Sequence, residues 1–138
     1  HFQAAMMMVR QLEFALFDFR LHRDYAPGCD IQALLDGVRD QVAVVTPPPW
    51  NRFQHSFSHI FAGGYAAGYY SYKWAEVLSA DAFERFTEEG IFNATTGHAF
   101  RDSILANGGA EDALELFRRF RGREPQVTAL LRQAGLIA

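Results

Sequence analysis

The chain has 138 residues, of which 49% are hydrophobic and 21% are charged, as is typical of one globular domain with one hydrophobic core. The net charge is −3, which argues against a nucleic-acid binder because such proteins carry a basic surface. The single cysteine, Cys29, excludes an internal disulfide and any metal site built from several cysteines. No run of about 18 apolar residues occurs and no signal peptide is visible, so we expect a cytoplasmic protein without a membrane span.

The beginning of the chain is unlike that of a natural domain. No methionine starts it, and a helical pattern follows at once without a Ser, Thr, Asp or Asn to cap it. Over residues 3–24, apolar residues recur on a face so wide that it should be buried on more than one side. We therefore expect a piece of a longer protein, whose exposed apolar area would make the isolated chain self-associate.

The next elements are also predicted to be helical. Asp30 can cap a helix over residues 31–43, which carries an apolar stripe. Residues 42–45 could form a short strand, but no second strand is apparent to pair with it. Residues 46–49 are predicted to be a stiff, polyproline-like connector, and residues 51–61 to be irregular or weakly helical.

A long helix is predicted from about residue 62 to residue 88. Gly68 would weaken it by roughly 1 kcal/mol relative to alanine, a cost tolerated where something passes close to the backbone. Gly90 would close it. The last three predicted helices run from about 93 to 106, from 111 to 121 before Gly122, and from Pro125 to a stop before Gly135. With no internal repeat, the sequence predicts an all-α, multi-helix array that forms a single helical segment over residues 1–138.

The segment from His59 to Trp74 is the most informative one for function, because it contains a histidine, three glycines and four tyrosines. Tyr65, Tyr69 and Tyr72 follow the spacing i, i+4, i+7, which on a helix places three phenol rings on one stripe. A row of hydroxyl donors suits a polar substrate on which a negative oxygen develops. Aromatic residues at this spacing more often pack in a core, yet each buried tyrosine hydroxyl needs a hydrogen-bond partner.

Two other clusters each have two interpretations. His55 and His59 have the i, i+4 spacing of zinc-binding histidines, but Ser56 occupies the place of the base. With no third ligand apparent, a structural metal is weighed against a polar pair on the substrate side. Arginines also gather near residue 121, where a nucleic-acid patch is weighed against pairing with acidic neighbours and with the helix dipole. These arginines are Arg118, Arg119, Arg121 and Arg123.

The run from His59 to Trp74, with its pattern Gly-Tyr-x-x-x-Tyr-Tyr-x-Tyr, resembles the C-terminal end of the thimet oligopeptidase and oligopeptidase A family of zinc metallopeptidases. The resemblance covers essentially the whole chain. Later runs that agree with it are Phe83…Phe86, Phe100-Arg101, Gly108-Gly109, the run from Arg119 to Pro125, and Leu130-Leu131.

The resemblance implies a mostly helical, two-lobed enzyme that cleaves short peptides with the help of one zinc ion. In this family a His-Glu-x-x-His helix and a later Glu hold the metal, which activates a water molecule while the motif Glu acts as base. No His-Glu-x-x-His occurs in this chain. The zinc ligands and the base would therefore lie upstream, in the N-terminal part of the same protein. We predict that the isolated chain binds no catalytic zinc and hydrolyses no peptide.

The family's catalytic residues carry over to three positions. Tyr72 would be the chief donor to the oxyanion, and Tyr65 would support the substrate or the transition state. His59 would hydrogen-bond the substrate near the scissile bond, whereas Tyr70 would only pack. The substrate-binding positions, of which the two glycines would form a flexible turn that lets the wall close, are Tyr69, Gly63 and Gly64.

From the residues alone, the alternative is a non-enzymatic helical module that presents the tyrosine stripe to peptides or to a protein partner. Storage of a metal by the histidines is a third option. The coding sequence upstream of residue 1 discriminates between the first two, because only the enzyme requires a His-Glu-x-x-His there.

Overall fold

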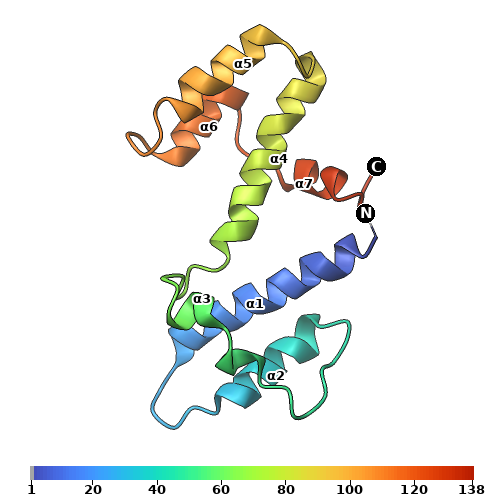
Figure 1. The fold of residues 1–138 in the computed structure, drawn as a ribbon, viewed down its shortest axis with the longest axis vertical. Helices are drawn as coiled ribbons and strands as arrows, with labels where there is room; N and C mark the ends of the chain where they lie inside the picture. Colours follow the sequence, from blue (N-terminus) through green and yellow to red (C-terminus); the bar gives the residue numbers. More distant parts are fainter. Residues whose placement is uncertain (1) are drawn as a thin grey trace. The chain divides into compact units, whose positions relative to one another are not determined.

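The computed structural model describes residues 2–138, whose regular structure is entirely helical, which confirms the predicted all-α class (Figure 1). The chain falls into two compact units, His1–Lys73 and Trp74–Ala138. No helix within the described residues is long and apolar enough to cross a bilayer. In chain order the elements are α1 (Ala4–Asp24), α2 (Ile31–Val42), the 3-10 turn η1 (Phe53–His55), α3 (Ser58–Phe61), α4 (Ser71–Glu89), α5 (Ala94–Phe100), the π-helical turn η2 (Arg101–Leu105), α6 (Ala113–Arg121) and α7 (Val127–Gln133).

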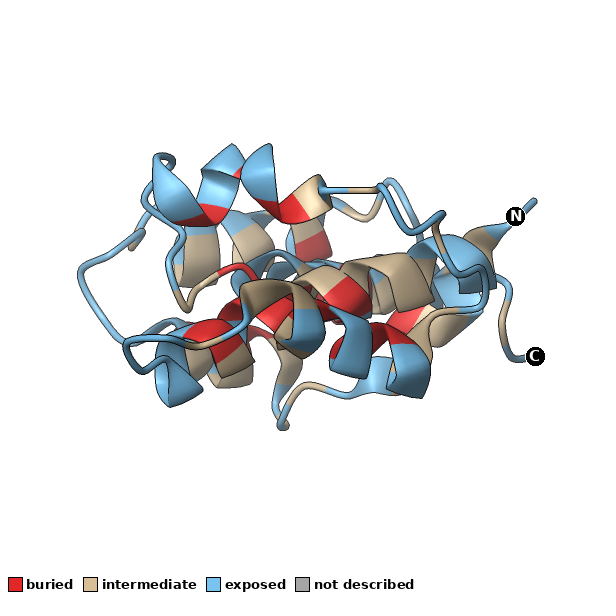
Figure 2. Cartoon of the chain, turned by 90° about the horizontal axis from the view of Figure 1, so that it is seen from below, coloured by how far each residue is buried: buried red, intermediate tan, exposed pale blue. Residues whose placement is uncertain are grey.

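The core of the first unit joins α1 to α2 and to the segment around α3. Phe17, Leu35 and Val38 are fully buried in one cluster. Burying each such side chain contributes about 1.5–3 kcal/mol. Exposed positions are interleaved with the buried ones along the helices (Figure 2). On α1 the exposed positions include Leu12 and Phe19, so the wide apolar face predicted for this helix is only partly covered.

A buried acid also ties α1 to α2. Glu13 is 2% exposed, and its carboxylate accepts hydrogen bonds from Arg39 Nε at 3.1 Å and from Arg10 at 2.9 Å. Arg39 also donates to the Asn51 side chain at 3.0 Å, which fixes the end of the proline connector. A charge this deep is tolerated because it is paired on two sides.

The helix predicted over residues 62–88 is wrong in its first part, because α4 begins only at Ser71 and the residues before it form turns. The amides of Ala62 and Gly63 both donate to the Ser58 carbonyl, at 2.7 and 2.8 Å, which ends α3 there. Gly64 follows with φ +79°, a left-handed conformation that stops a helix. Residues 42–45 form no strand.

In the second unit, aromatic rings pack between α4, α5 and α6. Phe120 is 1% exposed and lies 5.3 Å from the Phe100 ring and 6.1 Å from the Phe86 ring, centroid to centroid. The predicted end of α6 is confirmed, since Gly122 caps it with φ +74°. The last helix begins at Val127, two residues later than predicted.

The reason for that late start is Asp81, which is fully buried on α4. Its carboxylate accepts from the Gln126 amide at 2.7 Å, from Arg123 at 2.6 and 2.7 Å, and from Arg121 at 3.1 Å. Burial raises the pKa of Asp81, but these hydrogen bonds and the two guanidinium charges outweigh burial, so the pKa lies below its usual range.

The other arginines of the cluster are paired as well. Arg119 binds Glu111 with two hydrogen bonds of 3.0 and 2.6 Å, and Arg118 binds Glu115 and Glu124. The interpretation of the cluster as structural ion pairs is therefore confirmed.

We predict that Asp81→Ala destabilises the chain by about 3 kcal/mol at neutral pH, because it leaves the buried Arg121 without its deepest partner. Because the folded pKa of Asp81 is depressed, its contribution is complete above the unfolded value of about 3.9 and fades as the pH falls through the folded one. Urea unfolding at several pH values measures both effects. Asp102→Ala, which removes an exposed and solvent-screened pair with Arg101, is the control and should leave stability nearly unchanged. Equal losses for the two variants would contradict the account.

Candidate functional site

The three predicted catalytic residues come together on one open surface of the first unit. The rings of Tyr65 and Tyr72 lie 4.9 Å apart, and the His59 ring lies 6.1 Å from Tyr65 and 6.2 Å from Tyr72. Tyr65 is 37% exposed and Tyr72 is 38% exposed. His59 belongs to α3, Tyr65 to the loop of residues 62–70 and Tyr72 to the first turn of α4. The three rings are therefore brought together by this loop, and they do not lie on one helical stripe as the spacing predicted.

Tyr69 forms the floor beneath these residues. It is 9% exposed, and its ring lies 5.3 Å from Tyr72 and 5.6 Å from His59. Its hydroxyl donates to Gln11 Oε1 at 2.9 Å, and burial raises the pKa of Tyr69. The Tyr69 hydroxyl therefore forms its hydrogen bond within the first unit. The Tyr69 ring packs beneath the exposed tyrosines.

A buried carboxylate of α1 holds the loop that carries the tyrosines. Asp18 is 1% exposed; its Oδ1 accepts from the Ala67 amide and its Oδ2 from the Tyr69 amide, both at 2.9 Å. His22 Nδ1 lies 2.9 Å from the same Oδ1. Ala67 has φ +56°, which residues with a Cβ rarely adopt. The backbone at Ala67 is therefore held in an uncommon conformation next to a strong acceptor.

Sequence reasoning missed Asp18 and Gln11 as parts of the site. The signal was present, since both are polar residues seven positions apart on a helix with a wide apolar face. A charge flanked by Phe17 and Phe19 requires a buried partner. No pattern in the sequence identifies backbone amides almost fifty residues later as that partner.

The two predicted turn glycines are each required by the backbone. A Cβ on Gly63 would lie 3.0 Å from both Cα and the carbonyl oxygen of His59, and Gly64 has φ +79°. Gly68, by contrast, lies in the turn before α4, where a Cβ would meet Tyr65 at an ordinary 3.5 Å. The expected close approach to the backbone thus occurs at Gly63 rather than at Gly68.

We predict that Gly63→Ala destabilises the first unit by about 1–3 kcal/mol, because backbone atoms must move to admit the methyl group. The matched control is Gly68→Ala, which should leave stability unchanged or slightly raised. Denaturant unfolding of both variants measures the difference. Equal stability of the two would contradict the geometry.

The surroundings of Tyr72 disfavour its phenolate. Its side-chain hydrogen bond with Tyr65, its partial desolvation and the neighbouring charges of Tyr65 and Tyr69 together raise the pKa of Tyr72 to about 12. At neutral pH this phenol, like any tyrosine, carries no charge and can donate a hydrogen bond, and the raised pKa extends that state to higher pH.

We predict that Tyr65→Phe lowers the pKa of Tyr72 from about 12 toward the ordinary value of about 10. Because the folded pKa is raised, the stability that it contributes is complete below pH 10 and is lost as the pH rises toward 12. Titration of ¹³C-labelled tyrosine by NMR follows the group directly. Tyr70→Phe is the control, since Tyr70 is 51% exposed and packs on Phe19. An unshifted titration in Tyr65→Phe would exclude the hydrogen bond as the main cause.

Within residues 2–138, no three His, Cys, Asp or Glu side chains gather in a way that could hold a metal ion. His55 and His59 are both exposed, and His59 faces the tyrosine rings. The described part of the chain therefore offers no set of side chains that fits a zinc ion.

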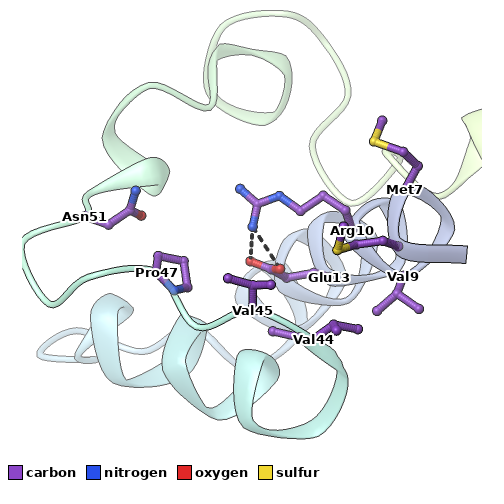
Figure 3. Close-up of a pocket in the computed structure, with 10 residues that line it drawn as sticks. Met7, Val9, Arg10, Glu13, Val44, Val45, Pro47 and Asn51 are labelled. Carbon is purple, nitrogen blue, oxygen red and sulfur yellow. Dashed lines mark hydrogen bonds and ion pairs between the residues drawn. The ribbon is translucent and has the colours of Figure 1, made fainter. Parts of the chain in front are cut away.

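A separate hollow of about 380 Å³ lies along the first half of α1 (Figure 3). Its walls include Met7 and Val9 of α1 and Val45, which directly precedes the proline connector. The Arg10–Glu13 ion pair also lines this hollow. It contains none of the predicted site residues.

The sequence matches the family described as peptidase family M3 over residues 1–136. The chain therefore belongs to this family of peptidases, which confirms the resemblance drawn from the tyrosine segment.

Among known relatives, oligopeptidase A of Haemophilus influenzae is 62% identical over 139 residues, and oligopeptidase A of Escherichia coli is 59% identical over 138. The probable cytosolic oligopeptidase A of Arabidopsis thaliana is 51% identical over 143 residues. Each alignment covers 99% of this chain but 20% of the relative. The chain thus spans about a fifth of the length of the relatives that it matches.

Proposed function

We propose that this chain is the C-terminal segment of the catalytic domain of a zinc-dependent oligopeptidase and supplies half of its active site. Membership of peptidase family M3 and the similarity to oligopeptidase A support this proposal. The single observation that carries the residue roles is the convergence of Tyr72, Tyr65 and His59 on an open surface above a buried floor.

The proposed chemistry of this half-site is hydrogen bonding to a peptide. When a peptide carbonyl becomes tetrahedral, its oxygen gains negative charge that a fixed donor stabilises. Tyr72 is suited to that role because its neutral phenol is exposed beside His59 and Tyr65 and can donate a hydrogen bond. Tyr65, whose ring lies 4.9 Å from that of Tyr72, would orient it and contact the substrate, while His59 would bind the peptide backbone near the scissile bond.

The zinc and the general base would come from residues upstream of this chain, since its sequence contains no His-Glu-x-x-His and no three potential metal-ligand side chains gather within residues 2–138. Bound there, the metal would supply an activated water molecule. The isolated chain would then bind no catalytic zinc and hydrolyse no peptide. Exposed apolar residues such as Leu12 and Phe19 would pack on the rest of the protein, and would make the isolated chain self-associate.

The substrates would be short peptides, as the name oligopeptidase A of the relatives suggests. Tyr69, Gly63 and Gly64 would shape the substrate wall, the glycines as a turn that lets it close. The compartment would be the cytoplasm, in keeping with the plant relative named as cytosolic.

We predict that Tyr72→Phe in the complete protein lowers kcat by about 10²-fold to 10³-fold, because one donor to the developing oxyanion is lost. KM should change little, since the hydroxyl acts mainly in the transition state. Steady-state cleavage of a fluorogenic short peptide measures both constants. Tyr70→Phe removes a hydroxyl outside the site and is the control.

An unaltered kcat in Tyr72→Phe would refute the role of that residue. The alternative, a non-enzymatic module that presents Tyr65 and Tyr72 to a peptide, predicts peptide binding without turnover. The two proposals separate on the complete protein, because only the enzyme releases cleaved product.

A further inference from the structure

We propose that α1 positions the exposed residues His59, Tyr65 and Tyr72, here called the tyrosine wall, for catalysis. It would do so through the carboxylate of Asp18 and the side-chain amide of Gln11. This inference rests on the proposed function, and it makes Asp18 and Gln11 positioning residues rather than catalytic ones, since neither side chain is part of the exposed wall. Both lie on one helix, two turns apart, and both reach the floor residue of the loop.

The first step of the argument is that Asp18 fixes the backbone of the loop. Its carboxylate accepts hydrogen bonds from the amides of Ala67 and Tyr69 at 2.9 Å each. Because Asp18 is only 1% exposed, water cannot replace these donors. A carboxylate that accepts two amides is a strong, charge-assisted partner. It compensates for the left-handed backbone of Ala67, which a residue with a Cβ otherwise avoids.

The second step is that Gln11 fixes the ring of Tyr69 from the far end. The Tyr69 amide is bound by Asp18 and its hydroxyl donates to Gln11 at 2.9 Å, so both ends of this residue are attached to α1. Tyr69 is therefore restrained both at its backbone amide and at its side-chain hydroxyl.

The third step is that the position of Tyr69 determines where the exposed rings of Tyr72 and His59 lie. Tyr69 packs edge-on against Tyr72 at 5.3 Å and against His59 at 5.6 Å. The Tyr72 amide also donates to the Tyr69 carbonyl at 3.3 Å. A displacement of Tyr69 would therefore move the hydroxyl of Tyr72 away from the reacting oxygen, and small displacements of that kind lower turnover strongly.

The test is a set of variants in the complete, zinc-loaded protein. Asp18→Asn keeps the shape of the side chain but places an amide nitrogen against one of the two backbone donors. It should lower kcat by about 10-fold to 100-fold with little change in KM. Gln11→Leu removes the acceptor of one neutral hydrogen bond and should lower kcat by about fivefold. Asp24→Asn, at the exposed end of the same helix, is the matched control and should retain full turnover.

The decisive comparison repeats Asp18→Asn in a Tyr72→Phe background. If Asp18 acts through the Tyr72 hydroxyl, the further loss of kcat there should shrink to about twofold or less. A merely structural role would reduce the active fraction equally in both backgrounds. Equal fractional losses, or an unchanged kcat in Asp18→Asn, would overturn the inference while leaving the proposed function standing.

Should Asp18→Asn fail to fold, Gln11→Leu carries the same comparison, because it deletes one neutral acceptor from a partly exposed position. An unchanged kcat in Gln11→Leu, or an equal loss with and without the Tyr72 hydroxyl, would then overturn the inference. If Tyr72→Phe itself has full turnover, the proposed function of the wall fails and this inference fails with it.

Discussion

The first unit depends on one buried carboxylate that accepts two backbone amides from a loop about fifty residues away. Asp18 is 1% exposed and contacts only His22 among the polar side chains of α1, and a carboxylate this deeply buried requires strong donors. The amides of Ala67 and Tyr69 provide them. The acid and the loop therefore determine each other: the loop makes the charge tolerable, and the charge makes the unusual backbone of the loop tolerable.

A buried acid, Asp81, organises the second unit in a related way, but with different donors. Asp81 meets two arginines and only one backbone amide, so its site is a compact ion-pair network that anchors the start of α7. Guanidinium groups suit this role because their donors are planar and fixed. Asp18 holds backbone in place beside the surface for which we propose a function, whereas Asp81 holds three segments of the second unit together.

Features that depend on neighbouring residues in the sequence could be predicted. The helical class followed from apolar periodicity, the start of α2 from a cap at Asp30, and the end of α6 from Gly122. The approach of Tyr65 to Tyr72 was anticipated from helical spacing, which was the wrong reason, and His59 was grouped with them through the family resemblance. Spacing suggested that the rings meet, and a turn brings them together instead.

Features that depend on distant partners could not be predicted. The prediction of a helix from residue 62 did not account for two tertiary contacts. Gly63 lies so close to His59 that a Cβ there would clash, and the Ala67 amide donates a hydrogen bond to Asp18. Each is a tertiary effect that overrides local helical preference. The roles of Gln11 and Asp18 were missed for the same reason, since their partners lie almost sixty and fifty positions away.

Amide hydrogen exchange at Ala67 and Tyr69 tests the central claim most directly, because it reports how firmly these two N–H groups are held. If Asp18 holds the loop as described, the amides of Ala67 and Tyr69 should exchange as slowly as the amides in the core of the first unit. They should exchange far more slowly than the neighbouring amide of Ala66. Exchange of Ala67 and Tyr69 at the rate of a freely exposed loop would contradict the account.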